Sequence, residues 1–218
     1  MNATARIRAK MVETLRTRGI LDERVLEAMS RIPRELFVGA ALGAQAYSDS
    51  PLPIGEKQTI SQPYIIAAMI QALELQGHER VLEIGTGSGY MTAILASVAS
   101  RVYSVERHAS LSMRARSVLE GMGFHNVALR SGDGTLGWRE FAPFDAVIVS
   151  AAGPDIPPLL VEQLRETGRL VIPVGPDKDQ QLLLGIKEGE GLHLEALGDV
   201  RFVPLIGKFG WDRNSTGS

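Results

Sequence analysis

The sequence of 218 residues contains no cysteine, which excludes disulfides, thiolate catalysis and cysteine-ligated zinc. It also lacks a basic excess, because 23 lysines and arginines stand against 25 aspartates and glutamates. A surface dedicated to nucleic acid or to a membrane would need that excess. No run of about 18 apolar residues occurs, and the first residues lack the apolar core of a signal peptide. We therefore expect a cytoplasmic protein with neither a nucleic-acid nor a membrane partner.

The composition is otherwise that of an ordinary globular protein, with 44% hydrophobic and 22% charged residues. The length suits one large domain, or a core with a small appendage. The first fifty residues have helical patterning. Ile7, Met11 and Leu15 recur at helical spacing, and Gly19 is placed to end that helix. Asp22 can cap a second helix.

Residues Ala46–Gln62 are predicted to form irregular backbone, because prolines interrupt any regular pattern there. A helix should follow, from about Pro63 to Leu75. Ser61 stands at the junction between the two. A serine in that place can cap the helix, act as a nucleophile or serve a site in another way, and the local pattern does not choose among these roles.

From Arg80 onward, short apolar runs alternate with helix-like stretches, which predicts right-handed βαβ units and a parallel sheet. After Gly175 two further runs follow without a strong helix between them, which indicates a closing pair of strands, at least one of them antiparallel. The predicted strands carry RVLEI, RVYSVE, NVALR, FDAVIVS and RLVIPV, and the predicted helices span about Tyr90–Ala99, Ser110–Gly121 and Ile156–Glu166.

The expected architecture is a doubly wound, mostly parallel α/β sheet with helices on both faces and an N-terminal helical appendage. Residues 1–62 would form the appendage and an active-site loop. Residues 63–218 would form the ligand-binding core, with substrate-contacting strands near its C-terminal end. We expect the two parts to pack as one compact unit.

A glycine loop follows the first strand of the core, in the sequence VLEIGTGSGY. Gly85, Gly87 and Gly89 allow a sharp turn and a close approach of the main chain to a ligand, just before a helix N-terminus. The spacing is G-x-G-x-G, with Tyr90 where a dinucleotide-binding loop has its third glycine. The loop alone is weak evidence for any one ligand.

Acidic residues beside this loop strengthen the case for a nucleoside. Glu83 lies inside the strand before the loop, where a carboxylate is awkward in a core but useful against a cationic or amine-bearing ligand. Glu106 ends the next strand, at the position where an acidic side chain holds both hydroxyls of a ribose. Either residue alone could equally be a solvated charge at a strand end. Together with the glycines they favour a nucleoside.

Asp133 supplies a third such strand end, in the sequence SGDGT. It could accept a hydrogen bond from an adenine amine, although alone it would be a plain Asp-Gly turn. Three successive strand ends form one row along the crevice where open α/β sheets bind ligands. The glycine loop has no lysine of the kind that binds phosphate, so a nucleoside without phosphates is implied.

This combination resembles the class I S-adenosylmethionine-dependent methyltransferases. The resemblance implies that the three glycines line the methionine part of the cofactor, that Glu106 holds its ribose and that Asp133 holds its adenine. S-adenosylhomocysteine would be the product. The cofactor site implied in this way consists of Glu83, Gly85, Thr86, Gly87, Gly89, Glu106, Asp133 and Gly134.

Longer motifs resemble one family within this class, the protein-L-isoaspartate O-methyltransferases. They are RIPRELFV, LPIGEKQTISQPY, SVER, HNV, GDG, PFDAVIV and RFVPL, and they cover nearly the whole chain. The resemblance implies methylation of isoaspartyl residues in peptides and proteins. Lys57 departs from the glycine common in this family, and Thr135 from a tryptophan common in its bacterial members. The tail GKFGWDRNSTGS matches no motif of the family.

The resemblance also implies the substrate side of the site. Thr59 and Ser61 would lie beside the substrate carboxylate, with Ser61 as the catalytic residue. The segment Arg201–Leu205 would offer an extended edge to the peptide main chain, through Arg201, Val203 and Pro204. Pairing of that kind recognises a peptide without reading its side chains, which suits an enzyme that acts on many damaged proteins.

Transfer of a methyl group to a carboxylate needs no strong base, because a carboxyl group with a pKa near about 4 is already ionised at neutral pH. The enzyme has to position and partly desolvate the nucleophile, and near-attack geometry alone can supply roughly 7–11 kcal/mol. A serine hydroxyl suits this work, since it donates one hydrogen bond and leaves the other carboxylate oxygen free to attack. Ser61 is therefore predicted to aim the substrate carboxylate, and a capping role stays open.

Three other functions are weaker alternatives. A class I methyltransferase for small molecules or nucleic acid would fit the cofactor loop, but SAAGP follows the fourth strand where a base pocket would need different residues. A nucleoside-binding module without catalysis is disfavoured because Thr59 and Ser61 are both present. A dehydrogenase is disfavoured by Tyr90. Isoaspartyl peptides and proteins are the expected partners, and a monomer is the favoured state.

Overall fold

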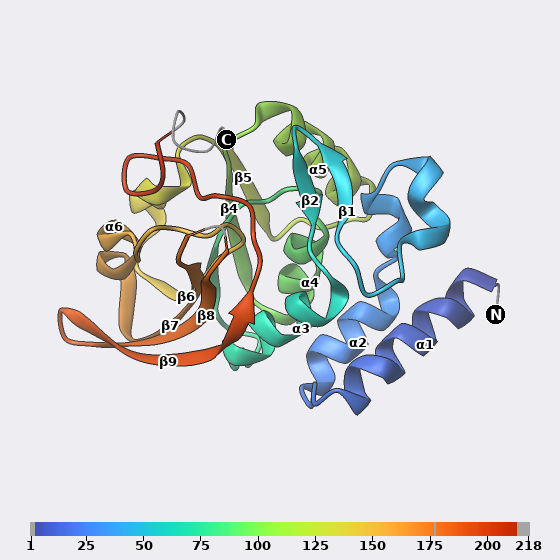
Figure 1. The fold of residues 1–218 in the computed structure, drawn as a ribbon, viewed down its shortest axis with the longest axis horizontal. Coiled ribbons are helices and arrows are strands. Elements are labelled where there is room, and N and C mark those ends of the chain that lie inside the picture. Colours follow the sequence, from blue (N-terminus) through green and yellow to red (C-terminus); the bar gives the residue numbers. More distant parts are fainter. Residues whose placement is uncertain (1–2, 177, 213–218) are drawn as a thin grey trace.

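A seven-stranded sheet forms the centre of the molecule in the computed structural model, which describes residues 3–176 and 178–212 (Figure 1). The strand order is β5-β4-β3-β6-β7-β8-β9. Strands β3 to β7 run parallel, and β8 and β9 are antiparallel to their neighbours, as predicted for a closing pair. The strands are β3 (Arg80–Ile84), β4 (Arg101–Glu106), β5 (Val127–Ser131), β6 (Phe144–Val149), β7 (Leu164–Val174), β8 (Gln180–Glu188) and β9 (Gly191–Val200).

The chain reverses its direction of travel across the sheet at β3. It moves from β3 through β4 to β5, then returns to the other side of β3 to place β6 and β7. In sheets of this kind ligands bind outside the carboxyl ends of the strands at such a switch point. The fold is therefore the predicted doubly wound α/β sheet, and it places the ligand crevice at the ends of β3, β4 and β6.

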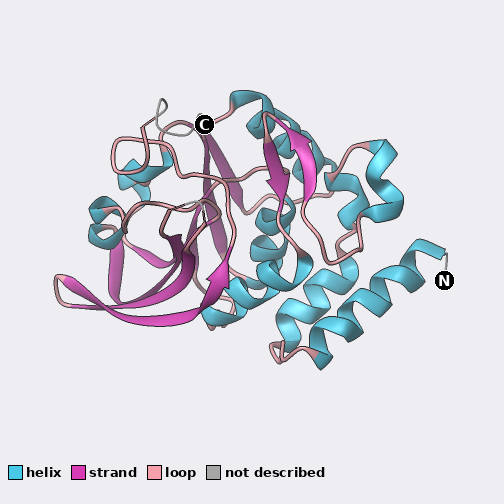
Figure 2. Cartoon of the chain, in the orientation of Figure 1, coloured by secondary structure: helices cyan, strands magenta, loops and turns pink. Residues whose placement is uncertain are grey.

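Helices cover both faces of the sheet, and most helical residues gather on one side (Figure 2). Residues alternate between the faces along each strand. Val81 therefore packs towards α4 and α5, whereas Leu82 packs towards α6 and the neighbouring 3₁₀ turns. The elements are α3 (Pro63–Ala72), α4 (Tyr90–Val98), α5 (Ala109–Gly121), α6 (Pro158–Glu162) and the 3₁₀ turns η3 (Gly134–Leu136) and η4 (Arg139–Phe141).

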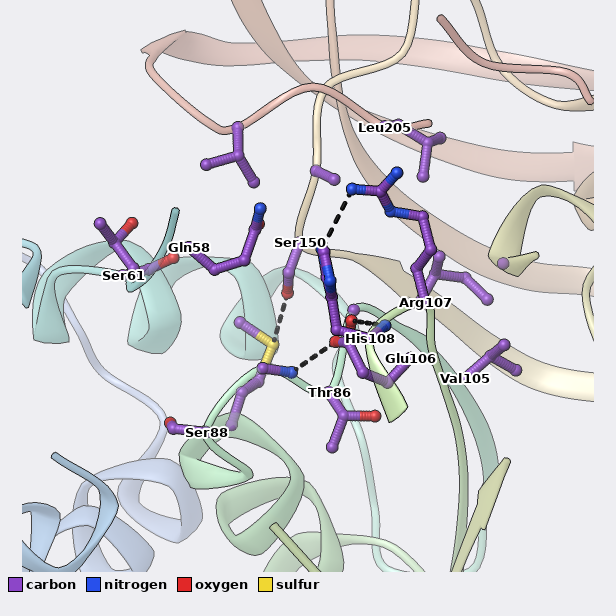
Figure 3. A pocket seen from close by; sticks show the side chains of 18 of the residues that line it. Gln58, Ser61, Thr86, Ser88, Val105, Glu106, Arg107, His108, Ser150 and Leu205 are labelled. Carbon is purple, nitrogen blue, oxygen red and sulfur yellow. Dashed lines mark hydrogen bonds between the residues drawn. The ribbon is translucent and has the colours of Figure 1, made fainter. Parts of the chain in front are cut away.

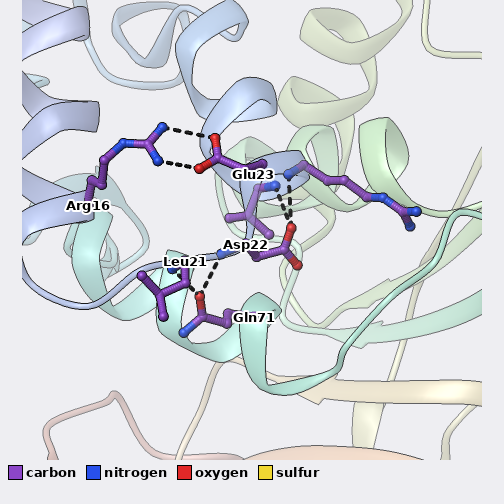
Figure 4. Close-up of polar contacts among 7 residues, drawn as sticks. Arg16, Leu21, Asp22, Glu23 and Gln71 are labelled. Carbon is purple, nitrogen blue, oxygen red and sulfur yellow. Dashed lines mark hydrogen bonds and ion pairs between the residues drawn. The ribbon is translucent and has the colours of Figure 1, made fainter.

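The N-terminal segment packs against α3, α4 and α5. Its elements are α1 (Ala3–Thr17), α2 (Glu23–Arg31), η1 (Arg34–Phe37) and η2 (Ala40–Gln45). Asp22 caps α2, as predicted, and the side-chain oxygen of Gln71 accepts the N–H groups of Leu21 and Asp22 at 2.6 and 2.9 Å (Figure 4). Met11 and Leu15 belong to the same hydrophobic core as Val81. One core therefore runs from the appendage to the sheet.

The segment predicted to be irregular contains a two-stranded hairpin instead. Strands β1 (Leu52–Gly55) and β2 (Gln58–Ile60) pair antiparallel. Leu52, Ile54 and Ile60 are buried. Pro53 and the residues at the tip of the hairpin are exposed. The alternation was hidden in the sequence by the prolines and by a turn that has no glycine at its centre. Glu56 and Lys57 form that turn, with φ of 52° and 56°.

Helix α6 is shorter than the predicted stretch from Ile156 to Glu166. It ends at Glu162, and β7 already begins at Leu164. Leu164 is buried and pairs with Phe144 of β6 before the register shifts. Tertiary pairing therefore converts residues with helical patterning into the start of a strand.

Candidate active site

The glycine loop connects β3 to α4 at the switch point of the sheet. Gly85, Gly87 and Gly89 have left-handed φ angles of 93°, 54° and 90°, which glycine adopts at no steric cost. Gly85 and Gly87 line a cleft that opens beside this loop. Gly89 does not, and its role is in packing: a Cβ there would lie 3.1 Å from the Cβ of Ala115 in α5. The third glycine therefore allows α4 to approach α5.

Glu106 lies at the end of β4, beside the glycine loop (Figure 3). Its Oε2 accepts the N–H of Gly87 at 2.9 Å, and its Oε1 accepts the N–H of His108 at 2.8 Å. A carboxylate has lone pairs for about four hydrogen bonds, so each oxygen keeps capacity for a ligand hydroxyl. The side chain is largely buried but lines the cleft. This position is compatible with the predicted contact to a ribose.

Glu83 departs from the prediction, because it faces the core behind the loop and not the cleft. Its Oε2 accepts hydrogen bonds from the hydroxyls of Thr92 and Ser104, each at 2.6 Å. Its Oε1 has no hydrogen-bond partner among the described residues. Burial raises the pKa of Glu83 to about 7; the two hydroxyls oppose this shift, and the charge of Glu106 adds to it. Glu83 supports the loop from the side of α4.

Asp133 follows β5 and lines a cavity beside the cleft, not the cleft itself. Its Oδ1 accepts the N–H and the hydroxyl of Thr135 at 2.9 and 2.7 Å, and its Oδ2 accepts the N–H of Lys208 at 2.7 Å. A carboxylate has lone pairs for about four hydrogen bonds, so Oδ2 keeps capacity for one more donor, and the contact to an adenine amine stays a prediction. The next residue, Gly134, does line the cleft. A side chain there would clash with Ile84.

Thr135, the second departure from the family pattern, joins this strand end to the C-terminal tail. It is fully buried, and its hydroxyl accepts the N–H of Phe209 at 3.2 Å. Trp211 anchors the same tail by donating its indole N–H to the carbonyl of Ala152 at 3.0 Å. The tail from Gly207 onward therefore packs beside the cleft as far as Asp212, and its last six residues lie outside the described chain.

One cleft connects the cofactor and substrate residues that the sequence predicts. It encloses about 820 Å³, including the part that is open to solvent. Figure 3 shows Glu106 and His108 on one side, Gln58 and Ser61 on the other, and Ser150 between them. The predicted site residues that line it are Thr59, Ser61, Gly85, Thr86, Gly87, Glu106, Gly134, Val203 and Pro204. The hydroxyl of Thr86 lies 2.5 Å from that of Ser104, so it is engaged within the protein.

A second cavity opens beside this cleft and shares a wall with it. Thr59, Ser61, Ser150, Val203 and Pro204 line both spaces. The second cavity encloses about 1460 Å³, again including open solvent. Arg201 lines this cavity but not the cleft. The two spaces therefore meet at Ser61 and Thr59, which gives a larger molecule access to whatever lies along the glycine loop.

The segment Arg201–Leu205 is extended but is not a strand of the sheet. It pairs with Ala152, which follows β6: Ala152 donates its N–H to the carbonyl of Val203 and accepts the N–H of Leu205, both at 2.8 Å. On the other edge, the side chain of Gln180 binds the N–H and the carbonyl of Phe202 at 2.7 and 3.2 Å. Fewer main-chain groups are therefore open to a peptide than predicted, because those of Phe202, the carbonyl of Val203 and the N–H of Leu205 are already paired.

Several residues around the site were not foreseen from the sequence. Ser150 lines both cavities, and Gln180 reaches Phe202 across 22 positions of the chain. The side chain of Asp49, and not that of Ser61, caps α3, since its Oδ1 accepts the N–H of Tyr64 at 3.1 Å. The polar ending of the strand FDAVIVS was the only available signal for Ser150. The other contacts join distant parts of the chain, which local patterns do not reveal.

The lining of the cleft fits S-adenosylmethionine. This ligand needs a carboxylate for its ribose, a main chain that can be approached closely and no phosphate-binding lysine. Glu106, Gly85 and Gly87 meet the first two needs, and no lysine occurs in the described lining. Fold and site together define a class I S-adenosylmethionine-dependent methyltransferase.

Comparison with known proteins identifies the family. The family model for protein-L-isoaspartate(D-aspartate) O-methyltransferases matches residues 6–210, and the chain belongs to this family. It is 58% identical over 206 residues to protein-L-isoaspartate O-methyltransferase 1 of Syntrophobacter fumaroxidans, covering 94% of this chain and 96% of the relative. The enzyme of Syntrophus aciditrophicus is 57% identical, with 94% and 95% covered. The chain is thus a methyltransferase acting on isoaspartyl residues of proteins, with S-adenosylmethionine as methyl donor.

Solved structures agree with this assignment. A protein-L-isoaspartate O-methyltransferase superposes with a TM-score of 0.86 at 31% identity, covering 93% of this chain and 67% of that one. A putative enzyme of the same kind from Plasmodium falciparum, solved in complex with S-adenosyl-L-homocysteine, has a TM-score of 0.79 at 25% identity, with 91% and 98% covered. In the described part of this chain, no helix is long and apolar enough to cross a membrane.

Proposed function

We infer that the chain repairs damaged proteins by methylating the free α-carboxylate of L-isoaspartyl residues. The observation that carries this inference is the meeting of two spaces at Thr59 and Ser61, one along the glycine loop and one beside Arg201–Pro204. A peptide in the outer space can present a carboxylate to a methyl donor in the inner one. Once methylated, that carboxyl group is an ester with a better leaving group, and the adjacent backbone nitrogen can close a succinimide. Hydrolysis of the ring returns some normal aspartate.

We propose that Glu106 holds the ribose of S-adenosylmethionine and that Gly85, Gly87 and Gly134 leave room for its close approach. Thr86 stands in the same lining, and Glu83 and Gly89 act from behind it. Asp133 would accept a hydrogen bond from the adenine amine through its Oδ2. When bound, the cofactor supplies an activated methyl group on a sulfonium. The hydrogen bonds from Gly87 and His108 to Glu106 support the ribose role, because they fix the carboxylate before any ligand arrives.

Ser61 would aim the substrate carboxylate, with Thr59 beside it. The carboxylate is ionised at neutral pH, so the enzyme needs no base near the reacting atoms. A single hydroxyl donor holds one oxygen and leaves the other free. A bidentate arginine would instead stabilise the bound substrate as much as the transition state, which does not accelerate the reaction. The half-buried position of Ser61 between the two spaces supports this role.

Val203, Pro204 and Arg201 would contact the main chain of the peptide. Isoaspartate differs from aspartate in the path of the backbone, which runs through the β-carbon and leaves the α-carboxyl free. Discrimination therefore depends on where the wall of the outer cavity holds that backbone relative to Ser61. Recognition through the main chain tolerates many flanking sequences.

Two matched peptides test the function. One contains isoaspartate and the other aspartate at the same position, and each is incubated with the enzyme and S-adenosylmethionine labelled in its methyl group. We expect base-labile label on the isoaspartyl peptide and background on the aspartyl peptide. Equal labelling of both peptides, or of neither, would contradict the inference.

The finer organisation is also a proposal. Residues 1–62 would serve as an appendage that completes the active site of the core, residues 63–218. The enzyme would work as a monomer in the cytoplasm, where the absence of cysteine is unremarkable because disulfides are rare there. Sedimentation equilibrium at assay concentrations tests whether the enzyme is a monomer, and cell fractionation tests whether it is cytoplasmic.

A further inference from the structure

We propose that Arg34 is a positioning residue for methyl transfer, because its guanidinium fixes the main chain that carries Ser61. The proposal rests on the function inferred above for Ser61. Arg34 lies in the short turn η1, 27 positions before Ser61, within the motif RIPRELFV that resembles the family.

The hydrogen bonds of Arg34 join the two ends of one segment. Its Nε donates to the carbonyl of Ala46 at 2.6 Å, and its Nη2 donates to the carbonyl of Ser61 at 2.8 Å. Between these carbonyls lies the segment that includes the β1–β2 hairpin and Thr59. One planar group therefore sets the distance between the start of the segment and the residue that should hold the substrate.

The same guanidinium also touches the cofactor side of the site. Its carbon lies 4.9 Å from the centre of the Tyr90 ring, within the range of a cation–π contact. Tyr90 is the first residue of α4 and follows the glycine loop directly. Phe37 also packs edge-on against the Tyr90 ring, with ring centroids 5.5 Å apart. Arg34 thus fixes Ser61 relative to the start of the helix behind the glycine loop.

Stability alone does not account for this arginine. The side chain is 0% exposed, and no carboxylate forms an ion pair with it among the described residues. Its Nη1 and the Tyr90 hydroxyl both lack a hydrogen-bond partner in the described chain. Burial lowers the pKa of Arg34 to about 10, so the group is still charged at neutral pH. A buried charge is retained at a cost that a well-packed apolar residue avoids, which points to specification of one loop conformation.

The test compares Arg34→Lys and Arg34→Met with the wild type. Methionine has a similar length and leaves no unpaired charge, so it should keep the fold while releasing both carbonyls. We expect Arg34→Met to lower kcat for an isoaspartyl peptide by about 10- to 100-fold, since a displacement of about 1 Å can cost that much. Arg34→Lys can reach one carbonyl and should recover part of the loss. The Kd for S-adenosylmethionine should stay within about threefold of wild type in both variants.

Arg24→Lys is the matched control. Arg24 also donates to a main-chain carbonyl, that of Leu75 at 3.1 Å, but it lies away from the cleft. This variant should keep wild-type kcat and KM. A double-mutant cycle with Ser61→Ala adds the decisive readout. Because Arg34 acts through Ser61, Arg34→Met should change kcat by less than about threefold when Ser61 is already alanine.

The outcomes separate this proposal from the function on which it rests. Failure of the wild type to label the isoaspartyl peptide overturns the function itself. With an active wild type, the positioning role is overturned by three results: wild-type kcat in Arg34→Met, additive effects in the cycle, or a cofactor Kd that weakens as much as kcat falls. It is also overturned if neither variant folds with saturating S-adenosylmethionine, because the arginine would then be structural.

Discussion

Glu106 accepts the N–H of Gly87 at 2.9 Å and so fastens the end of β4 to the glycine loop of β3. The bond joins two groups that are 19 positions apart in the sequence. A second N–H, from His108, holds the other carboxylate oxygen. The carboxylate is therefore fixed in place before it meets a ligand, and little conformational freedom remains to be lost on binding.

Replacement of Glu106 by alanine should weaken cofactor binding more than it slows the bound complex. Hydrogen bonds to a charged group contribute about 1.5–3 kcal/mol, which corresponds to an increase in Kd of roughly 10- to 100-fold. Calorimetric titration with S-adenosylhomocysteine measures this directly. Glu120→Ala, an exposed glutamate on α5, is the control and should bind like wild type. Unchanged affinity in Glu106→Ala would refute the ribose role.

The fold could be predicted from the sequence because its signals are local. Apolar runs alternate with helical stretches from Arg80 onward, and the glycines and Glu106 stand at strand ends where topology brings them together. The orientation of Glu83 could also have been derived, since it shares a face with Val81 and not with Leu82. The adjacent glycine loop nevertheless favours a ligand contact when the sequence is read locally.

The rest of the site depends on contacts between distant segments. Asp133 accepts the N–H of Lys208, 75 positions later, and Gln180 pairs with Phe202. Arg34 reaches Ser61 across 27 positions. Such contacts leave no periodic trace in the sequence, because each depends on which parts of the chain the completed sheet brings together.

Glu83 should make the stability of the enzyme depend on pH. Its pKa rises from an ordinary 4.5 to about 7 in the folded protein, so between these values the folded state holds the proton more tightly than the unfolded state. Stability is then lost as the pH rises through that window, and the loss is complete above about pH 7. At one pKa unit per about 1.4 kcal/mol, the decline from about pH 5 to about pH 8 is roughly 1–3 kcal/mol.

Glu83→Gln removes this titration while keeping an oxygen that accepts from Ser104 and Thr92. We expect its unfolding free energy, measured by urea denaturation, to lack the decline between about pH 5 and about pH 8. Glu140→Gln, an exposed change on η4, should retain the wild-type slope. If Glu83→Gln also retained it, the carboxyl group would be ionised in the folded protein throughout this range.

We expect Lys57 to affect the shape of the hairpin turn and not the chemistry of the site. It is exposed, does not line either cavity and has a left-handed φ of 56°. An L-residue in this conformation is strained by about 1 kcal/mol, and glycine relieves that strain. Lys57→Gly should raise the unfolding free energy by about 0.5–1 kcal/mol and leave kcat/KM within twofold of wild type.

The matched control is Lys57→Ala, which removes the charge but keeps the strained conformation. Its stability should equal that of the wild type. A fall in kcat/KM in both variants would show that the lysine charge attracts the substrate carboxylate, and the assignment to the turn would then be wrong. The assay uses isoaspartyl peptide below its KM, at two ionic strengths, because attraction by an exposed charge weakens with salt.

Ser61→Ala gives the sharpest test of the catalytic assignment. The hydroxyl does not cap α3, and it stands where the two cavities meet. Its loss should remove one hydrogen bond to a charged group, so kcat for an isoaspartyl peptide should fall by about 10- to 100-fold while cofactor Kd barely changes. Thr92→Ser serves as the control for a hydroxyl position away from the cleft, since serine keeps the bond to Glu83. A collapse of cofactor affinity in Ser61→Ala would instead place this serine in the cofactor pocket or in the support of the fold.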